Sequence, residues 1–152
     1  MKHLLSIIIF LSLMSVANSQ QSFKPLSQYV QDHDIYNDNG AMIYTLQRCS
    51  ALLNSINAIV FDQDKDLANE YFTSSNKLGV FAASLHSKVK NIKISVAEKE
   101  VADLIVAKSK FYLADMKDNY LKSGDYVSNS YIQTDLLFCT SVAKEFENFL
   151  SQ

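Results

Sequence analysis

Residues 42–60 read MIYTLQRCSALLNSINAIV, and this stretch decides the fold class of the chain. Its apolar side chains recur at alternating steps of four and three residues, at Met42, Leu46, Cys49, Leu53, Ile56 and Val60. That spacing predicts an α-helix that packs lengthwise against other helices.

A second stretch near the end of the chain has the same rhythm, with apolar residues at Ile132, Leu136, Cys139, Ala143, Phe146 and Leu150. Each stretch carries one cysteine on its apolar side, and Cys49 and Cys139 are the only cysteines in the sequence. Two cysteines in an exported protein most often pair. We therefore predict a disulfide between the first and last long helices, with two buried free thiols as the alternative.

The first residues predict export. Met1-Lys2-His3 is a short positive start, residues 4–16 are almost wholly apolar, and Ala17 and Ser19 offer the small residues that a signal peptidase reads. We predict a signal peptide over residues 1–19 and a periplasmic or extracellular location, with an uncleaved anchor as the alternative. The apolar core is shorter than the roughly 20 residues that span a bilayer, and we expect no membrane span after its removal.

Charge argues against nucleic acid as a partner, because the chain carries a formal net charge of −2 at pH 7. Arg48 is the only arginine. Sites that grip phosphate or carboxylate groups usually use the planar fork of arginine, so the scarcity of arginine also disfavours nucleotide chemistry.

The remaining pattern is helical. We expect further helices over about 66–93, 95–122 and 128 to the end, and no stretch alternates with the period of two that marks strands. Short connections between long helices favour antiparallel neighbours. We predict an all-α fold: an antiparallel up-down-up-down four-helix bundle over residues 40–152, preceded by an arm or short helix over residues 20–39.

Polar residues indicate where the helices begin and end. Asp38 or Asn39 can cap the first long helix, Ser95 with Glu98 forms a capping-box pattern, and Gly124 suits a left-handed C-terminal cap. Residues 73–76 and Gly79 are poor helix formers. The second long helix could therefore be continuous or broken near residues 74–79.

No residue pattern identifies a metal or cofactor site. Asp62, Asp64 and Asp66 resemble the opening of a calcium loop, but Leu67 and Thr73 stand where that loop needs glycine and glutamate. We interpret this run as a turn that caps a helix.

His86 raises the question of haem, because a histidine paired with Met42 or Met116 could ligate iron between helices. We favour a half-buried histidine at a helix edge and predict no cofactor.

Candidate interaction residues fall into three groups. Tyr44 and Tyr112 could line an internal pocket, with ordinary packing of tyrosine rings as the preferred alternative. Lys88, Lys90 and Lys93 cluster with Lys99 at one bundle end, where Asp32, Asp34 and Asp38 are expected to compensate them, although docking of an acidic partner is an alternative. Asp135 could meet Arg48, but we expect an exposed carboxylate.

These observations predict a non-enzymatic interaction or structural protein with an unidentified protein partner, because no catalytic constellation is present in the sequence. The alternative is a carrier that holds a small apolar ligand or cofactor between its helices.

Overall fold

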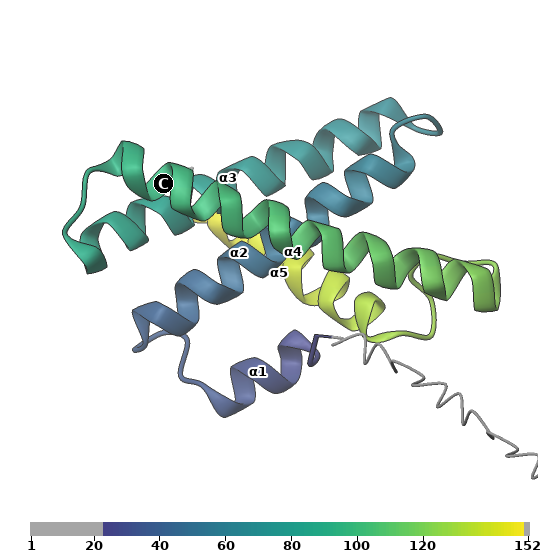
Figure 1. Cartoon of the computed structure of the whole chain (residues 1–152), viewed down its shortest axis with the longest axis horizontal. Coiled ribbons are helices and arrows are strands. Elements are labelled where there is room, and N and C mark those ends of the chain that lie inside the picture. The colour runs from purple at the N-terminus through teal and green to yellow at the C-terminus, as the bar shows by residue number, and fades with distance from the viewer. Residues whose placement is uncertain (1–22, 151–152) are drawn as a thin grey trace, which may run out of the picture.

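The computed structural model describes residues 23–150, and all regular structure in this part of the chain is helical (Figure 1). The five helices are α1 (Leu26–Asp32), α2 (Asn39–Val60), α3 (Lys65–Lys90), α4 (Ile94–Ser123) and α5 (Tyr131–Leu150). The all-α class is therefore confirmed. The predicted signal peptide, residues 1–19, lies outside the described residues.

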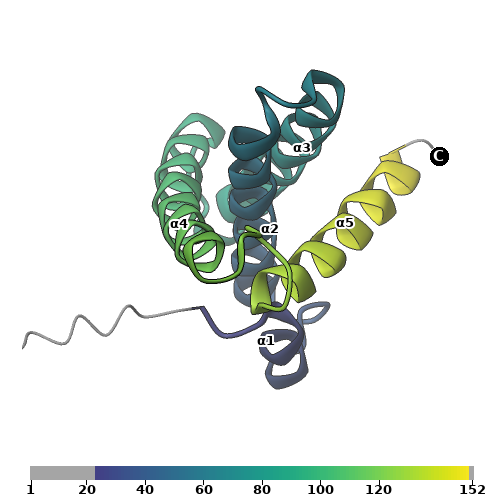
Figure 2. The same ribbon diagram turned by 90° about the vertical axis from the view of Figure 1, so that its right-hand side faces the viewer.

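Helix α2 is the central element, as its apolar pattern predicted. It contacts every other helix, and most of its side chains are buried, including Leu46, Leu52, Leu53 and Ile56. Helices α3 and α4 pack along it and against each other, and Figure 2 shows the three helices grouped together. Residues 42–60 thus form the axis of the hydrophobic core.

Serines allow α2 to approach its two neighbours closely. Ser50 and Ser75 exchange hydrogen bonds, because each hydroxyl donates to the backbone carbonyl of the other residue. Where α4 packs against α2, the Ser109 hydroxyl of α4 donates to the Ala51 carbonyl of α2. These bonds satisfy buried hydroxyls and fix the heights of α3 and α4 against α2.

Helix α5 lies differently from the other long helices. It packs mainly against α2 and α1, and Figure 2 shows it diverging from the group formed by α2, α3 and α4. Phe81 of α3 meets Phe146 of α5, with 4.5 Å between ring centroids. The regular up-down-up-down bundle is accordingly not confirmed, since the last helix crosses the bundle.

The disulfide between Cys49 and Cys139 is confirmed. Both cysteines are fully buried, and the bridge joins the middle of α2 to the middle of α5 across a sequence separation of 90 residues. It lies where α5 crosses α2.

Most helix ends follow the polar residues of the sequence. The Asp38 carboxylate accepts hydrogen bonds from Gly40 N and Ala41 N at the start of α2. Asp64 accepts from Leu67 N at the start of α3, which confirms that the aspartate run makes a capping turn. Gly124 ends α4 with a φ of 77°, the left-handed conformation expected of it.

Three predicted boundaries are wrong. Helix α3 ends at Lys90, because Asn91 takes the left-handed conformation and Ile92 N donates back to the Ser87 carbonyl. This leaves only three residues before α4, which begins at Ile94 with no side-chain cap, so Ser95 lies inside the helix and does not cap it. Helix α5 begins at Tyr131, three residues later than expected, after Asn129 with its positive φ.

The weak middle of α3 neither breaks nor ends the helix, which is continuous from Lys65 to Lys90. A Cβ added at Gly79 would lie 3.2 Å from Ile105 Cδ1 of α4 and 3.4 Å from the Ser50 hydroxyl of α2. The glycine therefore serves the close packing of three helices.

Candidate functional site

Arg48 lies at the centre of a fully buried polar cluster, the Arg48 centre, formed with Tyr112 of α4 and Asp135 of α5. The exposed fraction is 1% for Arg48 and 0% for Tyr112 and Asp135. Arg48 Nη2 donates to Asp135 Oδ2 at 2.5 Å, and Nε and Nη2 donate to the Tyr112 hydroxyl at 3.0 and 2.8 Å. Tyr112 in turn donates to Asp135 Oδ2 at 2.7 Å. One cluster thus joins α2, α4 and α5.

The Arg48 centre also holds the segment that precedes α1. Arg48 Nη1 donates to the Lys24 carbonyl at 2.7 Å, and Leu26 N donates to Asp135 Oδ1 at 2.6 Å. The Phe23 ring covers the guanidinium at 4.3 Å, a cation–π contact. The ion pair therefore fixes the backbone at the start of the described chain.

Burial and mutual attraction oppose each other in this cluster. Burial raises the pKa of Asp135, and the hydrogen bonds from Leu26, Arg48 and Tyr112 only partly offset that effect. Burial also disfavours the charge on Arg48, but the neighbouring Tyr112 and Asp135 outweigh it and raise the pKa of the guanidinium. The pKa of the Tyr112 hydroxyl is strongly raised by burial.

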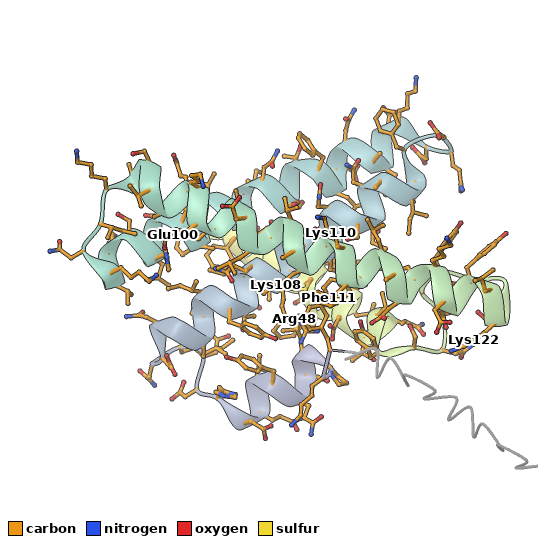
Figure 3. The ribbon with its side chains drawn as sticks, viewed as in Figure 1. Arg48, Glu100, Lys108, Lys110, Phe111 and Lys122 are labelled. Carbon is orange, nitrogen blue, oxygen red and sulfur yellow. A yellow bond between two sulfur atoms is a disulfide. The ribbon has the colours of Figure 1, made fainter. Side chains whose placement is uncertain are left out.

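Lys108 of α4 places a second positive charge near Arg48, at a half-buried position. Its ammonium donates to Gln47 Oε1 at 3.0 Å and lies 5.4 Å from the centre of the Tyr44 ring. Burial, and then repulsion from Arg48, lower the pKa of Lys108. Figure 3 shows Arg48, Lys108 and Phe111 gathered where α4 passes over α2.

The hydrogen bonds of the Arg48 centre favour a structural role over a catalytic one. All three guanidinium nitrogens of Arg48 donate to acceptors of the protein itself, so the only arginine of the chain is already engaged. The expectation of an exposed Asp135 is wrong, and the alternative that it meets Arg48 is correct. Asp135 is buried where α5 crosses α2, and the start of α1 also covers it, since Leu26 N donates to its carboxylate.

The structure divides the predicted interaction residues between two places. Tyr112 is at the Arg48 centre, and Tyr44 is beside it, 5.9 Å from ring centre to guanidinium carbon. The two tyrosines thus come together around a filled core.

The other predicted residues lie where α3 turns into α4. His86 Nε2 meets Glu100 Oε2 at 2.8 Å, and Lys90 Nζ donates to the same oxygen at 3.1 Å. The hydrogen bonds from His86 and Lys90 lower the pKa of Glu100. Lys88 and Lys93 are exposed nearby, and Lys99 pairs with Asp103.

The aspartates predicted to compensate the lysine cluster do not do so. Glu100 and Asp103 of α4 supply the compensating charge, because Glu100 pairs with Lys90 and Asp103 pairs with Lys99. The expected aspartates have other roles, since Asp38 caps α2 and Asp34 binds Asn37.

A different surface, which the sequence analysis missed, exposes apolar residues of α3 and α4 side by side. Val80 of α3 and Val106 of α4 have exposed fractions of 63% and 52% and line one groove of about 330 Å³. Exposed apolar residues continue away from the groove at helical spacing, at Phe72 on α3 and at Leu113 and Tyr120 on α4. We call this surface the α3–α4 face, defined by Phe72, Asn76, Val80, Val106, Leu113 and Tyr120.

The signal for this face was present in the sequence as a second apolar row on α4. Val106, Leu113 and Tyr120 follow one another at steps of seven, on a different side of the helix from the buried row of Val101, Tyr112 and Met116. The prediction of a helix over about residues 95–122 did not distinguish the two rows.

A second groove, of about 580 Å³, lies where α5 diverges from α3. Leu53, Leu67, Tyr71 and Ala143 contribute apolar surface, and polar side chains complete its lining, at Asn69, Glu70, Thr73, Ser74, Thr140 and Lys144. Its size is within the range of small-molecule sites.

Comparison with protein-family models, with curated proteins and with solved structures finds no match for this chain. Within residues 23–150, no helix is long and apolar enough to cross a membrane.

Proposed function

We propose that the chain is an exported, non-enzymatic interaction protein that binds a protein partner over the α3–α4 face. The observation that carries the proposal is the run of exposed apolar side chains on two neighbouring helices, centred on Val80 and Val106. A groove with exposed apolar side chains on two neighbouring helices is typical of protein interaction sites.

The polar groups support a role without catalysis. The donors of Arg48 bind the protein's own acceptors, and His86 Nε2 is engaged with Glu100. Groups that commonly perform chemistry in other proteins thus stabilise the fold here.

The disulfide supports the proposed location. A fully buried bridge between Cys49 and Cys139 is expected of a protein that folds in an oxidising compartment, such as the periplasm or the extracellular space.

Site-specific photo-crosslinking in the native cells tests the proposed surface. A photoreactive residue replaces Val106, and the matched control carries it at Leu137 of α5, which is also apolar and exposed, at 68%. We expect a discrete protein adduct from position 106 that is absent from position 137. Identical adducts from both positions, or none from position 106, would contradict the proposal.

A second candidate function, carriage of a small apolar ligand, is supported by the groove between α3 and α5. Native mass spectrometry of the protein purified from its own cells tests it. A bound small molecule that is lost on Ser74→Trp, which would fill the groove, supports carriage. A mass equal to that of the chain alone counts against it.

A further inference from the structure

The groove of the α3–α4 face has a shape that accepts large side chains from above. Its floor is α2, through Ser50 and Asn54, and its walls are α3 and α4. Small residues, Gly79, Ala83 and Ala102, line the walls, while Val80 and Val106 stand at its edges. A helix laid over two neighbouring helices inserts its apolar side chains into such a depression.

The exposed side of α4 carries the spacing that a lengthwise helical partner requires. Beyond the groove, Val106, Lys110, Leu113, Lys117 and Tyr120 follow one another at steps of four and three. All five are exposed, in contrast to the buried row on the other side of the helix. Alternating steps of four and three are the contact pattern of helices packed side by side.

The charges on this row are not matched within the described chain. Lys99 and Lys122 of the same helix pair with Asp103 and Asp118, whereas Lys110 and Lys117 have no ion-pair partner among residues 23–150. Figure 3 shows Lys110 on the side of α4 away from Lys108 and Phe111. Two unmatched cations beside apolar residues favour a partner that brings carboxylates.

Glu98 lines the other end of the groove. Lys110 and Lys117 lie on the exposed row that leads away from the groove, so Glu98 is separated from them along α4.

A second copy of this chain fits the face poorly. In a two-fold interface each residue near the axis meets its own copy. With the axis at the middle of the exposed row of α4, Lys110 would face Lys110 of the second molecule, and like charges in such contacts are unfavourable.

We propose that the α3–α4 face binds an amphipathic α-helix whose apolar side chains enter the groove and whose carboxylates pair with Lys110 and Lys117. This inference rests on the proposed interaction function and adds the chemical class of the partner.

Two synthetic helical peptides test the inference by fluorescence anisotropy with the full chain in its disulfide-bonded form. Both peptides have the same leucine row, one has glutamates beside the leucines, and the other has lysines at those positions. We expect the glutamate peptide to bind roughly tenfold more tightly, because two charge pairs form in place of two repulsions. Equal affinity for the two peptides would overturn the inference.

Charge reversal on the protein supplies the matched control. Lys110→Glu with Lys117→Glu should invert the peptide preference, whereas Lys99→Glu with Lys122→Glu, which changes the net charge equally, should leave it in place. Val106→Asp should weaken both peptides. Inversion by both double variants would show a non-specific charge effect and would overturn the inference.

The outcomes separate this inference from the proposed function. A protein adduct from position 106 that persists in Lys110→Glu/Lys117→Glu would keep the interaction function and reject the acidic helix. A homodimer in sedimentation that Val106→Asp dissolves would identify the second copy as occupant and also reject it.

Discussion

Arg48 shows how a single side chain can organise contacts between distant parts of a fold. Its guanidinium is bonded to the α1 lead-in, to α4 and to α5, and each donor has a protein acceptor. A buried ion pair of this kind adds little net stability over an apolar replacement, but it makes removal of one partner costly.

Substitution at Arg48 tests this asymmetry. Arg48→Met should lower the free energy of unfolding by about 3–5 kcal/mol, because the buried Asp135 carboxyl loses the guanidinium that pairs with it. Arg48→Met with Asp135→Leu should recover part of that loss, since no buried carboxyl is left unpaired but the Tyr112 hydroxyl and Leu26 N still lose their acceptor. Urea unfolding followed by circular dichroism measures both, with the exposed Lys110→Met as control, expected within about 0.5 kcal/mol of the wild type. A single variant as stable as the wild type would refute the assigned role.

The carboxyl of Asp135 should also affect how stability depends on pH. Burial raises its pKa in the folded state above the ordinary value of 3.8, so the folded protein holds this proton more tightly than the unfolded chain does. Its contribution to stability is therefore present at low pH and is lost as the pH rises through the folded pKa.

The difference in unfolding free energy between the wild type and Asp135→Asn should accordingly fall as the pH rises from about 4. Urea unfolding in a series of buffers measures this difference at each pH. A difference that grows with pH would show that attraction to Arg48 outweighs the effect of burial.

Gly79 and Gly124 would respond differently to an added side chain. At Gly79 the space is tight, because the nearest atom to an added Cβ is Ile105 Cδ1 at 3.2 Å, but that atom is the end of a flexible side chain. At Gly124 the backbone conformation requires glycine, with a φ of 77° and no atom within 4 Å of an added Cβ.

The two alanine substitutions should therefore differ in sign. Gly79→Ala should be neutral or stabilising by up to about 1 kcal/mol, since Ile105 also lines the α3–α4 groove and its terminal methyl can shift into it. Gly124→Ala should cost about 1–2 kcal/mol, because a left-handed residue with a Cβ is strained. Thermal unfolding of the two variants measures the contrast. Destabilisation by Gly79→Ala beyond that of Gly124→Ala would contradict it.

The helices were more predictable from sequence than their ends. Apolar rows fixed the existence of α2, α3, α4 and α5, because each row must be buried against another helix. The end of α3 was missed because asparagine is a less obvious left-handed cap than glycine, and the early start of α4 follows from the three-residue connection that results.

The crossing of α5 over α2 is the feature of the whole molecule that was not predicted from the sequence. The apolar row of α5 does not specify the angle at which it packs, and that angle decides which residues around the crossing are covered. Asp135 was expected to be exposed for this reason, since it is one position away from Leu136. The α3–α4 face was missed for the related reason that apolar residues were assumed to point inward.

The disulfide at the crossing should stabilise the fold without being required for it. Cys49→Ala with Cys139→Ala should lower the unfolding free energy by about 4–5 kcal/mol in the chain-entropy model, because the bridge closes a loop of 90 residues. Far-ultraviolet circular dichroism should still report a helical protein at room temperature. Loss of helical signal in the double variant would show that packing alone does not hold the five helices together.

The position of the bridge has a consequence for proteolysis. Helices α3 and α4, with the turns at both ends of each, lie between Cys49 and Cys139 in the sequence. Turns are the preferred sites of proteolytic nicking. A protease that cuts at residues 61–64, 91–93 or 124–130 would therefore leave a single covalent molecule, and the two pieces would separate only after reduction.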